Sequence, residues 1–227
     1  MKLSVIIPAY NEEATISEVI DKVRAVDLPV EREIIVVDDG STDHTVEILE
    51  QRQQDVTFVH FSRINFGKGA AIRIGLTYVT GDIVIIQDAD LELDPNEYKL
   101  LLQPILTDQA QVVYGSRFLQ ANPLISRRTI IANKFLTWLT NVLYQAHLTD
   151  METAYKAFQA EIVTGLQLTC HRFEFEPEVT AKLLQAGYRI REVPVSYNPR
   201  TADEGKKINW RDGVTAIWTL LKYRLSH

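Results

Sequence analysis

The fold is decided by the opening stretch of the chain, residues 3–42, which reads LSVIIPAYNEEATISEVIDKVRAVDLPVEREIIVVDDGST. Residues 3–7 and 33–37 are short apolar runs rich in β-branched side chains, a composition typical of buried strands. Between them, residues 12–26 carry apolar side chains at helical spacing. A strand, a helix and a second strand in this order form a βαβ unit, so the opening predicts a parallel sheet.

Strand and helix patterns continue to alternate over the rest of the chain. Further strands are predicted at residues 57–61, 82–87, 112–115 and 189–195, and further helices at residues 43–53, 68–79, 128–144, 176–185 and 210–223. This alternation predicts an α/β fold in which helices cover both faces of a mostly parallel sheet. Because no Gly- or Ser-rich linker interrupts the pattern, we expect a single domain over residues 1–227.

The composition is that of an ordinary globular protein. Of its 227 residues, 46% are hydrophobic and 24% are charged, which excludes a largely disordered chain. The single cysteine, Cys170, excludes an internal disulfide, and no apolar run is long enough for a membrane span or typical of a signal peptide. The net charge of −6 argues against a nucleic-acid partner. We therefore expect a cytoplasmic protein.

Polar side chains follow three of the predicted strands. Residues 8–12 read PAYNE, residues 38–43 read DDGSTD, and residues 88–92 read DADLE. In open α/β sheets, ligands bind beyond the carboxyl ends of the strands, so these segments form the predicted site. A structural interpretation stays open for residues 41–43, since Ser, Thr and Asp also cap helices and Asp-Gly is common in turns.

The acidic run after the fourth strand predicts a metal site. Asp88, Asp90 and Glu92 place three carboxylates within five positions, where they repel one another unless a cation lies between them. Mg²⁺ and Mn²⁺ bind carboxylate oxygens together with substrate phosphates, so a metal-chelated diphosphate is the expected ligand. The alternative is an acidic turn exposed to solvent.

Two basic clusters offer partners for an anion. Residues 115–134 contain four basic residues and no acid, and the loop before the last predicted helix contains three more. These residues are Arg117, Arg127, Arg128 and Lys134 in the first cluster, and Arg200, Lys206 and Lys207 in the second. Both clusters could bind phosphate groups, and both could equally be solvated surface.

The motifs together resemble a known enzyme family. The runs VIIPAYNE (residues 5–12), VVDDGST (36–42), DADLE (88–92) and GSR (115–117) resemble the inverting family-two glycosyltransferases, which have the GT-A type nucleotide-sugar-binding fold. The runs DMETAYKAF (150–158), FEFEPEV (173–179) and YRIREVP (188–194) resemble the polyprenol-phosphate sugar synthases, such as the dolichol-phosphate mannose and glucose synthases.

This resemblance implies a donor-binding half over residues 1–116. The donor would be a nucleoside-diphosphate sugar, GDP-mannose or UDP-glucose, and no motif distinguishes the two bases. By resemblance, the donor-binding residues are Pro8, Tyr10, Glu12, Asp39 and Asp88, and the ligands of a Mg²⁺ or Mn²⁺ ion are Asp88, Asp90 and Glu92. Asp90 is the firmest of these metal ligands, because Glu92 is replaced by Gln in some relatives.

The resemblance also implies an acceptor half over residues 117–227, with a polyprenyl phosphate as acceptor. Arg117 matches an arginine that faces the transferred sugar or the lipid phosphate, and Arg128 loosely matches a second phosphate-binding arginine. Arg200 and Lys206 would join them in a basic loop. A phosphate acceptor is already ionised and needs no protein base. Three residues are expected to be catalytic: Asp90, Arg117 and Asp150.

Two other functions stay open. A transferase that uses a saccharide hydroxyl as acceptor would need a carboxylate base, for which Asp150 and Glu152 are the candidates, although Asp150 could instead cap a helix. A non-catalytic receiver-like module also gathers acids at strand ends, but leaves half of the chain unexplained. A dinucleotide-binding fold is excluded, because PAYNEE stands where Gly-x-Gly-x-x-Gly would be required.

The last predicted helix suggests contact with a membrane surface. Apolar residues recur at helical spacing beside two basic residues, namely Val214, Ile217, Trp218, Leu221 and Leu225 beside Lys222 and Arg224. Many members of the resembling group carry C-terminal membrane spans that have no counterpart here, so we expect peripheral contact at the cytoplasmic membrane face. The alternative is that this helix packs on the protein's own core.

Overall fold

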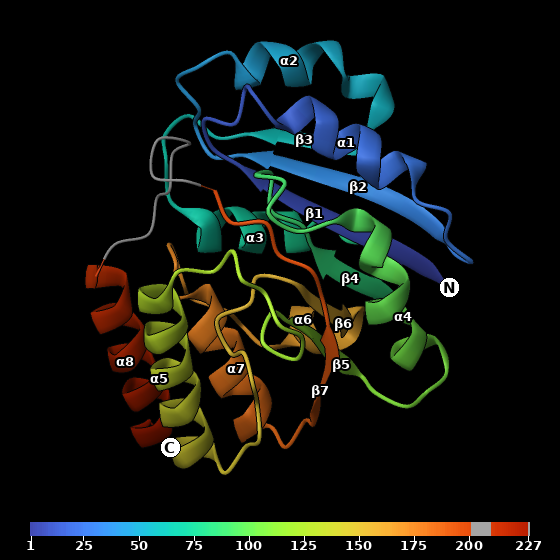
Figure 1. Ribbon diagram of the computed structural model, residues 1–227. Helices are drawn as coiled ribbons and strands as arrows, with labels where there is room; N and C mark the ends of the chain where they lie inside the picture. Colours follow the sequence, from blue (N-terminus) through green and yellow to red (C-terminus); the bar gives the residue numbers. More distant parts are fainter. Residues whose placement is uncertain (201–209, 227) are drawn as a thin grey trace.

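The structure, a computed structural model, describes residues 1–200 and 210–226. A seven-stranded sheet forms its centre, in the order β3-β2-β1-β4-β6-β5-β7 (Figure 1). The strands are β1 (Lys2–Ala9), β2 (Glu31–Asp38), β3 (Phe58–Phe61), β4 (Ile83–Ile86), β5 (Val112–Ser116), β6 (Lys156–Gln159) and β7 (Ile190–Pro194). Only β6 runs antiparallel to its neighbours, β4 and β5. The predicted mostly parallel α/β sheet is confirmed.

Helices cover both faces of this sheet. They are α1 (Ile16–Ala25), α2 (Thr45–Gln51), α3 (Lys68–Leu76), α4 (Tyr98–Leu106), α5 (Arg127–Tyr144), α6 (Ala160–Gly165), α7 (Phe175–Gln185) and α8 (Trp210–Leu225), with short 3₁₀ turns η1 (Gln53–Asp55) and η2 (Pro95–Glu97). Helices α1, α2 and α4 share one apolar cluster with the sheet, and α3, α6 and α7 share clusters on the other face.

The central strand β1 shows how the two faces arise. Leu3, Val5 and Ile7 are fully buried in the cluster with α1, whereas Ile6 is buried in the cluster with α3 and α7. Side chains of a strand alternate between its two faces, so an apolar run without polar interruption is what a strand covered on both faces requires. The carboxyl ends of the strands are thereby left as the polar edge.

Helices α5 and α8 form an outer layer. They share a third apolar cluster with α7, built around Leu136, Met151, Ala181 and Leu220. The two helices lie side by side at the lower left of Figure 1. Among residues 1–200 and 210–226, no helix combines the length and the apolar character that crossing a bilayer demands.

Three elements, β6, α4 and α6, were not predicted. Strand β6 has only four residues, one of them the fully buried Lys156, and its partners are distant in sequence: Val112 pairs with Phe158 and Ile83 pairs with Gln159. A strand this short carries no periodicity of its own, and its pairing with remote strands decides its structure.

Candidate functional site

The polar segments after β1 and β2 lie side by side at the carboxyl edge of the sheet. The backbone N–H of Asn11 donates to Ser41 Oγ at 2.9 Å, and that of Glu12 donates to Thr45 Oγ1 at 2.9 Å. The Glu12 side chain is buried at this edge. The hydroxyl groups after β2 therefore hold the loop that carries Tyr10 and Glu12.

Asp39 links this edge to the loop before α3. Its carboxylate accepts the backbone N–H groups of Phe66 at 2.9 Å and Gly67 at 2.6 Å. Burial raises the pKa of Asp39, and these two donors oppose the shift. The neighbouring Gly40 has φ +73°, and a Cβ there would lie 2.5 Å from the carbonyl carbon of Ile64. Glycine is therefore required in this turn.

Asp88 is held by a half-buried lysine at the start of α3. Lys68 Nζ lies 2.8 Å from Asp88 Oδ1 and 3.0 Å from Asp88 Oδ2, and it also lies 3.0 Å from Glu176 Oε1 on α7. Burial opposes the charge on Lys68, but the two carboxylates outweigh it and raise its pKa. Lys68 therefore ties the acidic strand end to the second half of the chain.

Asp90 is the most crowded carboxylate of the edge. Burial and the negative charges of Asp88 and Glu92 raise its pKa to about 7. Arg200 Nη2 lies 3.2 Å from Asp90 Oδ2, and the same guanidinium donates to both oxygens of Glu12 at 2.9 and 3.0 Å. The acids that follow β1 and β4 are thus bridged by an arginine from the segment after β7.

The three acids predicted to bind metal do not form a complete ligand set by themselves. In the part of the chain that the structure describes, no three His, Cys, Asp or Glu side chains are arranged to hold a metal ion. Mg²⁺ and Mn²⁺ often take only one or two protein carboxylates and complete their shell with substrate phosphates and water. A half-buried carboxylate crowded by like charges, such as Asp90, suits such an ion.

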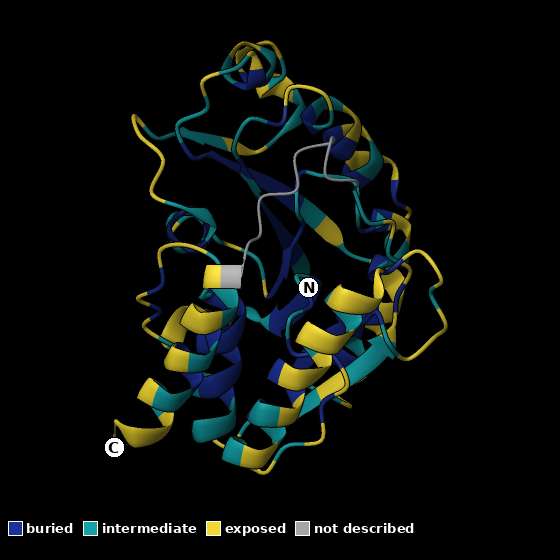
Figure 2. Ribbon diagram, turned by 60° about the vertical axis from the view of Figure 1, so that its left-hand side comes forward, coloured by how far each residue is buried: buried dark blue, intermediate teal, exposed yellow. Residues whose placement is uncertain are grey.

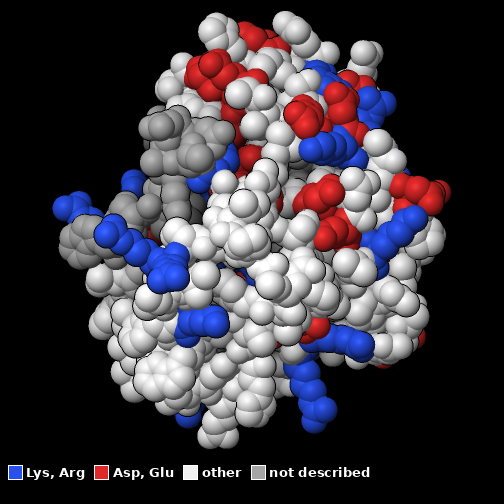
Figure 3. Space-filling view, viewed as in Figure 1, with Lys and Arg blue, Asp and Glu red and all other residues white. Residues whose placement is uncertain are grey.

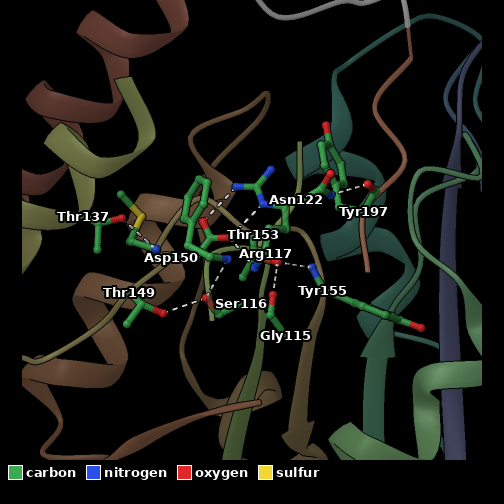
Figure 4. A network of polar contacts seen from close by, with 12 residues as sticks. Gly115, Ser116, Arg117, Asn122, Thr137, Thr149, Asp150, Thr153, Tyr155 and Tyr197 are labelled. Carbon is green, nitrogen blue, oxygen red and sulfur yellow. Dashed lines mark hydrogen bonds and ion pairs between the residues drawn. The ribbon is translucent and has the colours of Figure 1, made fainter. Parts of the chain in front are cut away.

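Arg117 and Asp150 form a buried, bidentate ion pair at the end of β5 (Figure 4). Arg117 Nε donates to Asp150 Oδ2 at 2.7 Å and Arg117 Nη2 donates to Oδ1 at 2.8 Å, while the Arg117 backbone N–H donates to Oδ2 at 3.0 Å. Burial disfavours the arginine's charge, but Asp150 outweighs it and raises the pKa of Arg117. Asp150 therefore orients the guanidinium.

A wider network fixes this pair. The backbone N–H groups of Thr149 and Asp150 donate to Glu192 on β7, at 2.8 and 2.9 Å. The guanidinium carbon of Arg117 lies 5.1 Å from the ring centre of Tyr197, whose carbonyl accepts from Asn122 Nδ2 at 2.6 Å (Figure 4). Residues from β5, β7 and the loop after α5 thus meet around one cation.

The remaining predicted residues have different surroundings. Pro8 and Tyr10 are half-buried at the end of β1, and Arg128 is exposed in the first turn of α5. Lys206 and Lys207 lie outside the described residues. Glu92 accepts from Tyr197 at 2.8 Å and so contacts the segment after β7.

The sequence matches a family model over most of this site. The model described as glycosyl transferase family 2 covers residues 4–160, which span most of β1 and continue to β6, and which include Glu12, Asp39, Asp88, Asp90, Glu92 and Asp150. The chain belongs to glycosyl transferase family 2. The predicted glycosyltransferase and its GT-A type fold are thereby confirmed.

Two relatives in this family carry names that mention polyprenol phosphates. The undecaprenyl-phosphate 4-deoxy-4-formamido-L-arabinose transferase of Photorhabdus laumondii is 32% identical over 75% of this chain and 52% of its own length. The dolichyl-phosphate beta-glucosyltransferase of Trichomonas vaginalis is 29% identical over 99% of this chain and 73% of its own length. The chain therefore spans about half the length of the Photorhabdus relative.

A solved glycosyltransferase has the same fold over nearly the whole chain. The glucosyl-3-phosphoglycerate synthase of Mycobacterium tuberculosis, crystallised with Mn²⁺, uridine diphosphate and phosphoglyceric acid, is 25% identical with a TM-score of 0.75. The match covers 99% of this chain and 78% of that one.

Several residues of this glycosyltransferase site were missed by sequence reasoning. Lys68 stands in the run GKG (67–69), between a predicted strand and a predicted helix, where no motif marked it as part of a site. Lys156 is fully buried and donates to the carbonyls of Met151 and Thr153, and burial lowers its pKa to about 8. Nothing local in the sequence indicates that Lys156 is internal.

Glu152, considered beforehand only as an alternative base, has an unusual environment. Its Oε1 atom is buried and has no hydrogen-bond partner among the described residues. Burial and the charge of Glu176 raise the pKa of Glu152 to about 7. Unlike Asp150, whose oxygens both accept from Arg117, Glu152 keeps an unused acceptor.

Proposed function

We propose that this chain transfers a hexose from a nucleoside-diphosphate sugar to a polyprenyl phosphate, with inversion at the anomeric carbon. The observation that carries the proposal is the placement of an acidic edge and a buried, oriented arginine at the carboxyl ends of one sheet. The names of the two polyprenol-phosphate relatives support this acceptor class.

The acidic edge is the donor site. Pro8, Tyr10, Glu12 and Asp39 hold the nucleoside, and Asp88 lies at the diphosphate. Asp90, with Asp88 and Glu92, would hold a Mg²⁺ or Mn²⁺ ion together with the donor phosphates. When bound, such an ion would stabilise the negative charge that develops on the leaving diphosphate. The solved relative with Mn²⁺ and uridine diphosphate supports a divalent metal here.

The buried arginine serves the acceptor. Arg117 binds the acceptor phosphate and Asp150 keeps its guanidinium in one orientation, while Arg128 offers a second, exposed cation. A phosphate oxygen, already ionised near neutral pH, attacks the anomeric carbon opposite the diphosphate. The bond from that carbon to the diphosphate oxygen breaks as the new bond forms, and no proton needs to be removed.

A second acceptor class is favoured by one observation, the unpartnered Glu152 Oε1. A saccharide hydroxyl would require a base to take its proton. Both oxygens of Asp150 accept from Arg117, so Glu152 is better placed for that role than Asp150. This reaction would place a neutral acceptor where the first proposal places a phosphate.

The test measures transfer of labelled sugar from UDP-glucose and from GDP-mannose, with Mn²⁺, to a polyprenyl phosphate and to a neutral saccharide. We expect a labelled lipid from one of these donors, and a loss of at least ~100-fold in Asp90→Asn with its melting temperature unchanged. Transfer to the saccharide alone would contradict the lipid acceptor, and dependence on Glu152 would then identify the base.

The transferase acts at a membrane surface, which it contacts through the outer faces of α5 and α8. Large apolar side chains are exposed there at helical spacing: Ile131, Phe135, Trp138 and Val142 on α5, and Val214, Trp218 and Leu225 on α8. In Figure 2, exposed residues run along the outer side of the helix that ends at C, which is α8. Large contiguous apolar patches on soluble monomers commonly mark a binding surface.

The charge of this surface favours an anionic bilayer over another protein. No acid occurs between Arg117 and Asp150, and the basic residues around the exposed apolar side chains are Arg127, Arg128, Lys134, Lys222 and Arg224. In Figure 3 acidic side chains gather over the upper part of the molecule, whereas the lower part, over α5 and α8, is mainly white and blue. Basic and apolar side chains together bind anionic membrane surfaces.

A further inference from the structure

Arg200 links two carboxylates that follow different strands. Its guanidinium donates to both oxygens of Glu12, at 2.9 and 3.0 Å, and lies 3.2 Å from Asp90 Oδ2. Glu12 follows β1 and Asp90 follows β4, whereas Arg200 follows β7. The arginine therefore supplies positive charge at the place where the acids of the edge converge.

The backbone around Arg200 is anchored independently of its side chain. Glu92 Oε1 accepts the backbone N–H of Arg200 at 2.8 Å, and Glu92 Oε2 accepts the Tyr197 hydroxyl at 2.8 Å. The backbone N–H of Asn198 donates to the Glu92 carbonyl at 2.9 Å. Segment 197–200 is thus hydrogen-bonded to the loop after β4. This anchored backbone positions the Arg200 guanidinium beside Asp90.

The carboxylates proposed to bind metal are consequently all engaged by groups of the protein. Both oxygens of Asp88 contact Lys68, and both oxygens of Glu92 accept from segment 197–200. Asp90 accepts the Glu92 backbone N–H on Oδ1 and faces Arg200 on Oδ2. A divalent ion on Asp90 would stand within a few ångströms of the guanidinium, where two cations repel strongly.

We infer that Arg200 is a resident counter-ion of the donor site, which competes with the divalent metal for Asp90 and must leave Asp90 when the metal–donor complex binds. This inference rests on the proposed metal site. On leaving Asp90, the guanidinium stays beside the donor, because Glu92 still holds its backbone. A diphosphate then offers the bidentate partner that a carboxylate offered before.

Mn²⁺ titration followed by electron paramagnetic resonance, at constant ionic strength and without nucleotide, tests the competition. Arg200→Gln is expected to bind Mn²⁺ roughly tenfold more tightly than the unaltered chain, because the competing cation is gone. Arg200→Lys keeps the charge but cannot span Glu12 and Asp90 together, so its affinity should lie between the two.

Arg191→Gln is the matched control. It removes the same charge from an exposed arginine on β7, whose guanidinium donates to Gln109 at 2.7 Å, and it should leave Mn²⁺ affinity unchanged. With a nucleoside diphosphate present, the effect of Arg200→Gln on affinity should reverse. This variant should bind the Mn²⁺ complex of the diphosphate more weakly than the unaltered chain does, because the donor phosphates lose Arg200 as a partner.

Two results would overturn the inference, and they are distinguishable. In the first result, Mn²⁺ binding is lost in Asp90→Asn but is not tightened in Arg200→Gln. This result would refute the competition alone. Mn²⁺ binding that is indifferent to Asp90→Asn would refute the proposed metal site and the counter-ion with it. Circular dichroism melting curves of each variant confirm that the fold is retained.

Discussion

At the scale of single residues, the Arg117–Asp150 ion pair places two opposite charges in the interior of the protein. Asp150 is fully buried and Arg117 nearly so. Removal of one member leaves the other buried without a partner, which typically costs about 3 to 5 kcal/mol. We therefore predict that Asp150→Leu lowers the free energy of unfolding by about that amount, as measured by urea denaturation.

A double-mutant comparison separates charge from shape at this pair. Arg117→Met combined with Asp150→Leu removes both charges, so no buried charge is left unpaired, and this double variant should be more stable than Asp150→Leu alone. Its transferase activity should nevertheless fall strongly, because the acceptor phosphate loses its buried, oriented arginine and keeps only the exposed Arg128. If the double variant were less stable than Asp150→Leu, lost packing, and not the unpaired charge of Arg117, would be the main cause of the lower free energy of unfolding.

At the scale of elements, Glu178 connects α7 to the loop that precedes it and to helix α8. Its carboxylate accepts the backbone N–H groups of Thr169 and Cys170, the Tyr223 hydroxyl of α8 at 2.8 Å, and Lys182 Nζ at 2.6 Å. Burial opposes ionisation, but these donors outweigh it and lower the pKa of Glu178 to about 2. The docking of α8 on α7 therefore depends on a charged carboxylate.

This lowered pKa predicts a pH-dependent contribution to stability. A carboxylate with a depressed folded-state pKa stabilises the fold fully above its ordinary value near 4.5, and that contribution fades as the pH falls toward 2. Glu178→Gln should therefore lower the free energy of unfolding by about 3 kcal/mol at pH 7. In denaturation series at pH 7, 4 and 3, the difference from the unaltered chain should shrink steadily. Glu161→Gln, an exposed change on α6, should show no such trend.

How far the sequence predicts the structure depends on the range of the contacts involved. Strands β1 and β2 and the acids at their carboxyl ends were predictable, because a buried strand and the polar residues after it are local patterns. The partners of those acids were not. Lys68 meets Glu176 across 108 positions and Arg200 meets Glu12 across 188, and no local pattern encodes such pairs. Arg200 was accordingly predicted from its basic loop as an acceptor residue, and its contacts with Glu12 and Asp90 could not be predicted.

The last helix shows a second kind of limit. Its apolar residues were predicted to form one face, but the structure divides them: Ile217 packs in the cluster with α5 and α7, while Val214, Trp218 and Leu225 are exposed. The contribution of α5 to the exposed apolar surface was not predicted, because the sequence does not show that α5 packs beside α8. The apolar periodicity of the sequence predicts the helix, but the helices that pack against it decide which of its apolar residues are buried.

At the scale of the whole molecule, the outer faces of α5 and α8 predict salt-sensitive membrane binding. The protein should sediment with vesicles that contain phosphatidylglycerol, and less so as salt is raised, since screening weakens the basic residues. Trp138→Ser with Trp218→Ser should reduce binding at low salt, because each exposed indole favours the interface.

Leu100→Ser provides the control, since Leu100 is also exposed and apolar but belongs to α4, which lies away from α5 and α8 (Figure 1). It should leave vesicle binding unchanged. A concentration-dependent dimer that the double tryptophan variant dissolves, with no vesicle binding at any salt, would instead identify a second copy of the chain as the partner of this surface.

The antiparallel strand β6 also constrains how the chain acquires its fold during synthesis. Strands β1 to β4 can pair in the order in which they emerge, but β5 has no neighbour until β6 arrives about 40 residues later, and β7 follows after about 30 more. Until then the nascent polypeptide presents the unpaired backbone edges of the apolar strands β4 and β5 to its surroundings. Unpaired edges of this kind promote aggregation, so the interval between β5 and β6 is when a ribosome-associated chaperone would protect this protein most.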